Sequence, residues 1–127
     1  MRVLGIDYGE KRIGLAVSDY SGSFARELKI VSPAVFFDEL DALLGELEIE
    51  KIVIGWPLNM SGERTAKTEE VESFKKKVEQ VVTVSVELMD ERLSSKMAAS
   101  IIGSEERIDS MAAQIILQNY LDKQKNN

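Results

Sequence analysis

Short apolar runs separated by polar turns dominate the beginning of the chain. Residues 2–7 (RVLGID), 12–19 (RIGLAVSD) and 23–31 (SFARELKIV) each predict a β-strand. The polar connections between them, YGEK and YSG, are short enough for antiparallel hairpins. The pattern therefore predicts that the chain opens with three consecutive antiparallel strands.

Helical spacing of apolar residues follows. Ser32 and Pro33 have the features of a helix start, with serine as the N-cap and proline at the first helical position. An apolar stripe at spacings of four, three, one and three comes next: Phe36, Leu40, Leu43, Leu44 and Leu47. The β-branched run at 51–55 (KIVIG) then predicts a strand that is buried on both faces.

The second half of the chain alternates between helical and strand patterns. We expect a helix over about 64–79 and an alternating strand over 82–89. A helix that begins at Ser94 or Ser95 would end at Gly103, and Ser104 would cap the last helix. This order predicts a single α/β domain over 1–127, with a mixed five-stranded sheet, helices on both faces and strand 2–7 at its centre. It is the order of elements in the ribonuclease H-like fold.

Composition narrows the chemistry that such a domain can perform. The chain contains neither Cys nor His, which excludes disulfides, thiolate nucleophiles, the usual zinc sites and Ser-His-Asp catalysis. No apolar run approaches the roughly 20 residues that span a bilayer, so we expect a cytoplasmic protein without a membrane partner. The net charge of −6 is unlike that of a protein that simply coats nucleic acid, but it is compatible with a nuclease.

Acidic residues stand at the ends of several predicted elements. Asp7 closes the first strand, Asp90 and Glu91 follow the last strand, and Asp109 lies in the first turn of the final helix. If they converge at one sheet edge, their mutual repulsion favours a bound Mg²⁺ or Mn²⁺, in a site for two ions that acts on a phosphodiester. Taken singly, Asp7 could be a turn former, Asp109 a favourable charge at a helix N-terminus, and Asp90 and Glu91 part of a solvated loop.

Polar and basic residues near the same predicted edge could contact a phosphate backbone. The loop 55–62 follows a central strand, and Trp56 within it could either stack on a base or pack beneath the loop. The basic run at 75–77 is interpreted as a solvated helix face. The candidate nucleic-acid contacts are Lys11, Arg12, Asn59, Arg64 and Arg92.

Four blocks of the sequence resemble the signature blocks of the YqgF family, also called RuvX. They are GIDYGEKRIGLAVSD (5–19), IVIGWPLNMSG (52–62), DERLSS (90–95) and IDSMAAQIILQNYL (108–121), and they occur in the family's order. The resemblance implies a metal-dependent nuclease with a ribonuclease H-like fold. Members are associated with processing the 5′ end of pre-16S ribosomal RNA, and were earlier proposed to resolve Holliday junctions.

The resemblance also assigns roles to residues. Asp7 matches the family's strand-one acid and Asp109 the acid of its last helix. The third acid belongs to the DERLSS block, where we favour Glu91 as the metal ligand for its longer reach and keep Asp90 as the alternative. One departure is the segment 103–107, which is short and acidic (GSEER) where many members carry a longer basic one. This departure favours an RNA precursor over a four-way DNA junction as the substrate. For the oligomeric state we expect a monomer or a homodimer.

Two other functions compete with the nuclease. A non-catalytic nucleic-acid-binding factor in ribosome assembly would retain the acids for stability or metal binding, and the net charge and the short segment 103–107 favour it. The motif D-x-G before a hairpin also cradles ATP phosphates in actin-like and sugar kinases. Those enzymes close two such domains over a nucleotide, whereas 127 residues supply one.

Overall fold

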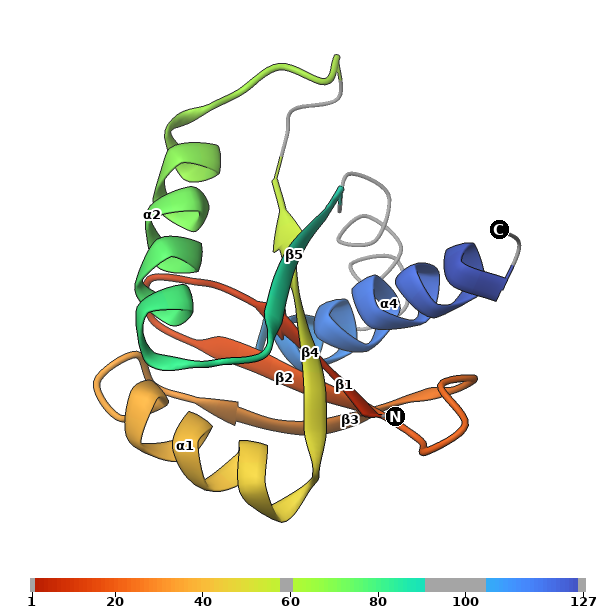
Figure 1. The fold of residues 1–127 in the computed structure, drawn as a ribbon. Coiled ribbons are helices and arrows are strands. Elements are labelled where there is room, and N and C mark those ends of the chain that lie inside the picture. Colours follow the sequence, from red (N-terminus) through yellow and green to blue (C-terminus); the bar gives the residue numbers. More distant parts are fainter. Residues whose placement is uncertain (1, 58–60, 91–104, 126–127) are drawn as a thin grey trace.

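The computed structural model describes residues 2–57, 61–90 and 105–125, with only the helical backbone for 105–110. Five strands and three helices are described, and Figure 1 shows their arrangement. The strands are β1 (Arg2–Asp7), β2 (Ile13–Ser18), β3 (Ala25–Val31), β4 (Ile49–Trp56) and β5 (Ser85–Asp90). The helices are α1 (Phe36–Glu46), α2 (Ala66–Val81) and α4 (Glu105–Lys125).

All five strands form one mixed sheet in the order β3-β2-β1-β4-β5. Strand β1 pairs antiparallel with β2 and parallel with β4, and β4 pairs parallel with β5. The predicted mixed sheet with a central first strand is therefore confirmed. Because β1, β4 and β5 run in the same direction, their carboxyl ends lie along one edge of the sheet.

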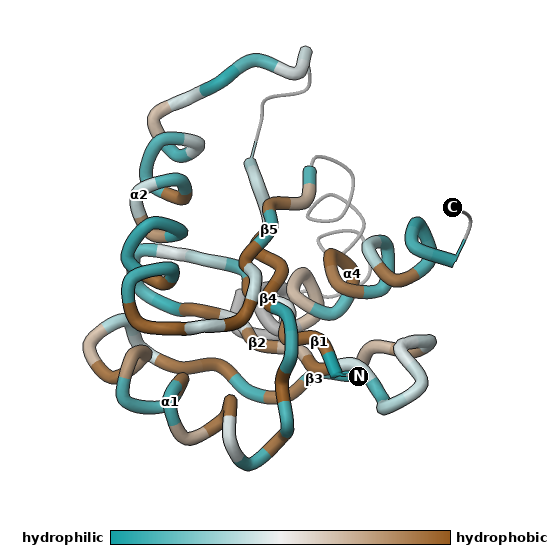
Figure 2. Tube along the Cα trace, in the orientation of Figure 1, coloured by the Kyte–Doolittle hydropathy of each residue, from teal (hydrophilic) through white to brown (hydrophobic). Residues whose placement is uncertain are grey.

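The two faces of the sheet are covered by different helices. Leu4 and Ile6 of β1 belong to the larger apolar core, which includes the buried residues of α1 and α2. Val3 belongs to a second core with Ala113 and Leu117 of α4. This division follows the alternation of side chains along a strand, and Figure 2 shows the corresponding apolar interior. Of the described helices, none combines the length and apolarity needed to cross a membrane.

The predicted start of the first helix is wrong. Ser32 and Pro33 lie in a turn that Val35 closes by donating its N–H to the Ser32 carbonyl, and α1 begins at Phe36. Its N-cap, Val35, has no side chain that could accept a capping hydrogen bond. The serine–proline pair therefore marks the exit from β3 and does not form the first turn of the helix.

The other boundaries agree with the predictions to within a few residues. Helix α2 begins and ends two residues later than expected, and β5 begins at Ser85 instead of residue 82. The predicted helix between Ser94 or Ser95 and Gly103, and the predicted cap Ser104, lie outside the described residues. The last helix is present and extends to Lys125.

Candidate nuclease site at the carboxyl edge of the sheet

Asp7 is the last residue of the central strand and is half-buried. Its neighbour two positions earlier, Gly5, faces α4, because a Cβ built on Gly5 would lie 2.8 Å from Leu117 Cβ and 3.2 Å from the Ala113 carbonyl oxygen. Since side chains alternate along a strand, Asp7 lies on the same face as Gly5. The central acid of the sequence prediction therefore stands at the carboxyl edge, on the face that α4 covers.

Helix α4 carries the second predicted acid, Asp109. Asp109 occupies the helix position one turn before Ala113, the residue whose carbonyl approaches Gly5. Four helical residues span about 6 Å, and the two strand residues from Gly5 to Asp7 span about 6.6 Å. The backbone positions of Asp7 and Asp109 thus lie similar distances from the contact between β1 and α4. Because α4 runs from this edge back towards the start of β1, both displacements have a component towards the carboxyl edge.

Hydrogen bonds fasten the rest of α4 to the sheet. The Gln118 side chain accepts from the Ala25 N–H at 2.8 Å and donates to the Ser23 carbonyl at 3.0 Å. Tyr120 donates to Glu87 at 2.6 Å and accepts from Lys51 at 2.9 Å. These bonds connect α4 with β3, β4 and β5, so strands on both sides of the central strand fix the position of the helix.

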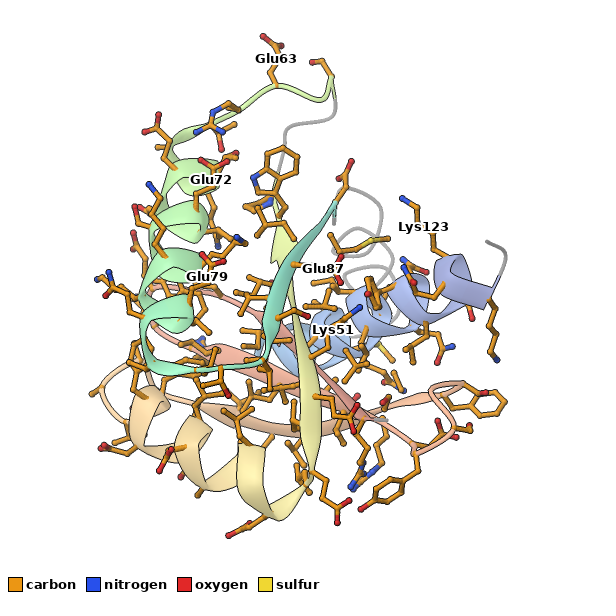
Figure 3. All side chains as sticks on the ribbon, in the orientation of Figure 1. Lys51, Glu63, Glu72, Glu79, Glu87 and Lys123 are labelled. Carbon is orange, nitrogen blue, oxygen red and sulfur yellow. The ribbon has the colours of Figure 1, made fainter. Side chains whose placement is uncertain are left out.

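Lys51 and Glu87, the two charged partners of Tyr120, also form an ion pair with each other. Figure 3 shows them on the neighbouring strands β4 and β5. Lys51 Nζ lies 3.0 Å from Glu87 Oε2. The hydrogen bond from Tyr120, followed by that from Lys51, holds the pKa of Glu87 below its usual value. The pKa of Lys51 is raised, because Tyr120 and Glu87 both accept hydrogen bonds from its ammonium group.

Asp90 lies at the end of β5 and pairs with Trp56 of β4. The register Ile6–Ile54 and Trp56–Asp90 places Asp90 on the face of Ile6, which is opposite to the face of Asp7. Two strand spacings, about 10 Å, separate β5 from β1. Strand alternation therefore directs Asp7 and Asp90 to opposite faces of the same edge.

The remaining predicted site residues are placed only in part. Glu91, Asn59 and Arg92 lie outside the described residues. Lys11 is exposed and Arg12 is half-buried in the connection between β1 and β2. Within the described part of the chain, no three acidic side chains form a group that could hold a metal ion.

The β1–β2 connection is held in a compact shape by two contacts. A Cβ on Gly9 would lie 2.6 Å from the Arg12 carbonyl oxygen, so the close approach of the two backbone segments requires glycine. Tyr8 stacks on Phe74 of α2 with a centroid separation of 4.3 Å. The exposed cation Lys11 is therefore carried by a turn anchored beside Asp7.

Arg64, another predicted nucleic-acid contact, is paired within the protein. Both of its terminal nitrogens donate to the carboxylate of Glu72 on α2, and Trp56 Nε1 donates to the same carboxylate at 3.1 Å. Figure 3 shows Glu72 directed towards the end of β4. The hydrogen bond from Arg64 is the main reason that the pKa of Glu72 is lowered. Trp56 is thus bound to α2 through its indole N–H, and its two predicted roles, base stacking and packing beneath the following loop, stay predictions.

A threonine pair anchors the other end of this loop, and the sequence interpretation missed it. Thr65 caps α2 by accepting from the Thr68 N–H, while the Thr68 hydroxyl accepts from the Thr65 N–H. The buried Thr68 hydroxyl also donates to the Pro57 carbonyl. The spacing T-x-x-T before the apolar positions of α2 was the available signal, because it places a hydroxyl at N-cap and N3.

The sheet order and the two-sided helical cover define a ribonuclease H-like α/β fold. Solved structures share it across almost the whole chain. The RuvC protein of Thermus thermophilus, solved with a Holliday junction substrate, matches with a TM-score of 0.60 and 17% identity over 98% of this chain and 96% of that one. The fowlpox virus Holliday junction resolvase matches with a TM-score of 0.57 and 10% identity over 97% and 99%.

The chain belongs to the RuvX family, whose model, described as Holliday junction resolvase, matches residues 1–123. Curated relatives are named "Putative pre-16S rRNA nuclease". One from Caldanaerobacter subterraneus is 37% identical over 99% of both chains. Another, from Syntrophomonas wolfei, is 39% identical over 96% of this chain and 94% of its own. The resemblance seen in the sequence motifs is therefore confirmed.

Proposed function

We propose that this protein is a metal-dependent nuclease that hydrolyses phosphodiester bonds in RNA, in the maturation of the 5′ end of pre-16S rRNA in the cytoplasm. Membership of the RuvX family and the names of the curated relatives support this proposal. The observation that carries it is the position of Asp7. It ends the central strand, on the face that is covered by α4, the helix whose sequence includes Asp109.

The donor set fits a hard divalent cation. Asp7 and Asp109 offer carboxylate oxygens, the ligands that Mg²⁺ and Mn²⁺ prefer. For the third carboxylate we propose Glu91, because its alternative Asp90 belongs to the sheet face opposite to Asp7. Two Mg²⁺ or Mn²⁺ ions, when bound, would supply a nucleophile at neutral pH and stabilise the charge on the leaving oxygen.

The protein's own groups would hold and orient the substrate. Lys11 is exposed in the connection that follows Asp7, and Arg12, Asn59 and Arg92 are the further candidates for contact with phosphates. The net charge of −6 does not oppose such contacts, because all of it lies in one segment. Residues 32–50 contain six acidic and no basic residues, and the remainder of the chain carries sixteen of each sign.

Replacement of Asp7 by asparagine tests the nuclease proposal. Asp7→Asn preserves the size of the side chain and removes its charge, so Mg²⁺-dependent cleavage of a pre-16S RNA fragment should fall about a thousandfold. Glu46→Gln, an equal loss of charge at the end of α1, serves as the control and should leave cleavage unchanged. Normal cleavage by a folded Asp7→Asn protein would exclude the proposed catalytic role and support the non-catalytic assembly factor.

A comparison of Glu91→Gln with Asp90→Asn tests the third carboxylate. We expect Glu91→Gln to reduce cleavage as strongly as Asp7→Asn, and Asp90→Asn to reduce it much less. The reverse order would assign the role to Asp90.

Resolution of Holliday junctions is the second candidate function. It is favoured by the description of the family model and by the fold shared with two junction resolvases. Symmetric cleavage of two strands requires two active sites, and hence a homodimer, whereas trimming of RNA needs only one. Cleavage of a four-way DNA junction and of the precursor RNA should be compared, with Mg²⁺ present and absent, alongside the mass of the protein in solution.

A further inference from the structure

A groove with an apolar floor lies on the helical layer formed by α1 and the end of α2. Its volume is about 210 Å³, and the lining residues are Phe37, Asp38, Leu40, Asp41, Leu44, Val81 and Val82. Val81 is 62% exposed, although it is a large aliphatic residue at the end of a helix. Figure 1 shows α1 below the lower end of α2, the two elements that contribute most of these lining residues.

Two carboxylates of α1 border this apolar floor. Asp38 and Asp41 line the groove and are exposed on α1. They belong to the segment 32–50, which contains six acidic residues and neither lysine nor arginine. Glu39, an acid of the same helix that does not line the groove, forms an ion pair with Lys29 of β3. Among the described residues that line the groove, none is a lysine or arginine that could balance Asp38 and Asp41.

From this combination we infer that the groove is a docking site for a basic segment of another protein, anchored by apolar side chains. The volume of the groove lies below the roughly 300–1,000 Å³ of typical small-molecule sites. The groove is nevertheless large enough to hold one or two aliphatic side chains. Amphipathic helices commonly bind such grooves through apolar residues three or four positions apart. Lysine or arginine residues beside these anchors would face Asp38 and Asp41, which adds specificity and accelerates association.

The charge of the groove also determines which kinds of partner bind it weakly. Nucleic acid and anionic membranes carry the same sign as Asp38 and Asp41, so the lining of the groove disfavours them. The groove therefore suits a cationic protein segment better than nucleic acid. The inference does not depend on the proposed nuclease activity, because the groove shares no residue with the site at the carboxyl edge.

A fluorescent peptide of leucine and lysine, with its leucines along one helical face, probes the groove by fluorescence anisotropy. We expect saturable binding that weakens as salt is raised. Asp38→Lys combined with Asp41→Lys should weaken it roughly tenfold or more. The matched control is Glu46→Lys combined with Glu50→Lys, the same change of net charge on exposed acids outside the groove, and it should weaken binding less than about threefold.

Two further measurements separate specific docking from general attraction. Val81→Ser removes apolar surface without changing the charge and should weaken binding about fivefold, as should replacement of the peptide's leucines by serine. Melting curves establish that each variant is folded, and RNA cleavage should be unchanged in all of them. Equal losses in the two double variants, or equal binding of the lysine–serine peptide, would overturn the inference.

Discussion

The contact between Gly5 and α4 can be tested by adding a single methyl group. In Gly5→Ala the new Cβ would lie 2.8 Å from Leu117 Cβ and 3.2 Å from the Ala113 carbonyl oxygen. Neither atom is the free end of a flexible side chain, so the helix itself must shift. Overpacking of a buried site costs about 1–3 kcal/mol, which exceeds the 0.4–1 kcal/mol or so gained by restricting the unfolded chain. We therefore expect a net loss of about 1–2 kcal/mol.

Urea unfolding and thermal melting measure this loss. The free energy of unfolding should fall by about 1–2 kcal/mol and the melting temperature by roughly 4–10 °C for a domain of this size. Gly45→Ala is the control, because a Cβ at Gly45 meets nothing within 4 Å, and it should stabilise α1 by up to about 1 kcal/mol. Cleavage should also fall in Gly5→Ala, since α4 carries Asp109. A Gly5→Ala protein as stable as the original would refute the close approach of α4 to β1.

Two further predictions concern charged pairs. Glu72→Gln should strengthen RNA binding and steepen its dependence on log salt by roughly 0.7, because it releases the charge of Arg64. A filter-binding titration measures both the affinity for RNA and its salt dependence. In the same assay Arg64→Ala should weaken RNA binding less than Lys11→Ala. The opposite order would show that the Arg64–Glu72 pair opens when RNA binds. Tyr120→Phe should make stability less sensitive to acid, since Tyr120 is the main cause of the lowered pKa of Glu87. The stabilisation of the fold by ionised Glu87 is present above the usual glutamate pKa of roughly 4.3, and it is lost as the pH falls through the lower pKa of the folded state. The urea midpoints measured at about pH 6 and pH 3 should therefore differ less in Tyr120→Phe than in the original protein.

The order of elements could be predicted because each element carries a strong local signal. The apolar runs of β1 and β2 and the helical stripe of α1 identify their structures from spacing alone, and short connections imply antiparallel pairing. The start of α1 could not be predicted in this way. Ser32 and Pro33 suit both a helix N-terminus and a turn, and the choice depends on how the chain leaves β3.

Arg64 and Asp90 show why the site was only partly predictable. As a basic residue in a loop after a central strand, Arg64 resembles a phosphate contact, but folding brings Glu72 to it from the next helix. For the third acid the sequence offered only the longer reach of Glu91 over Asp90, whereas the strand register assigns Asp90 to the face opposite to Asp7. The pairing of Arg64 and the register of Asp90 both arise only from the tertiary fold.

The sequence by itself determined the family, the α/β class, the absence of cysteine and histidine chemistry, and the concentration of negative charge in residues 32–50. These properties depend on residue identity and local spacing. Only the tertiary structure decided that α4 lies against Gly5, that Asp7 faces this helix, and that the acidic segment borders an apolar groove. Such features depend on long-range packing, in which side-chain volume and strand register select one arrangement among those that the local pattern allows.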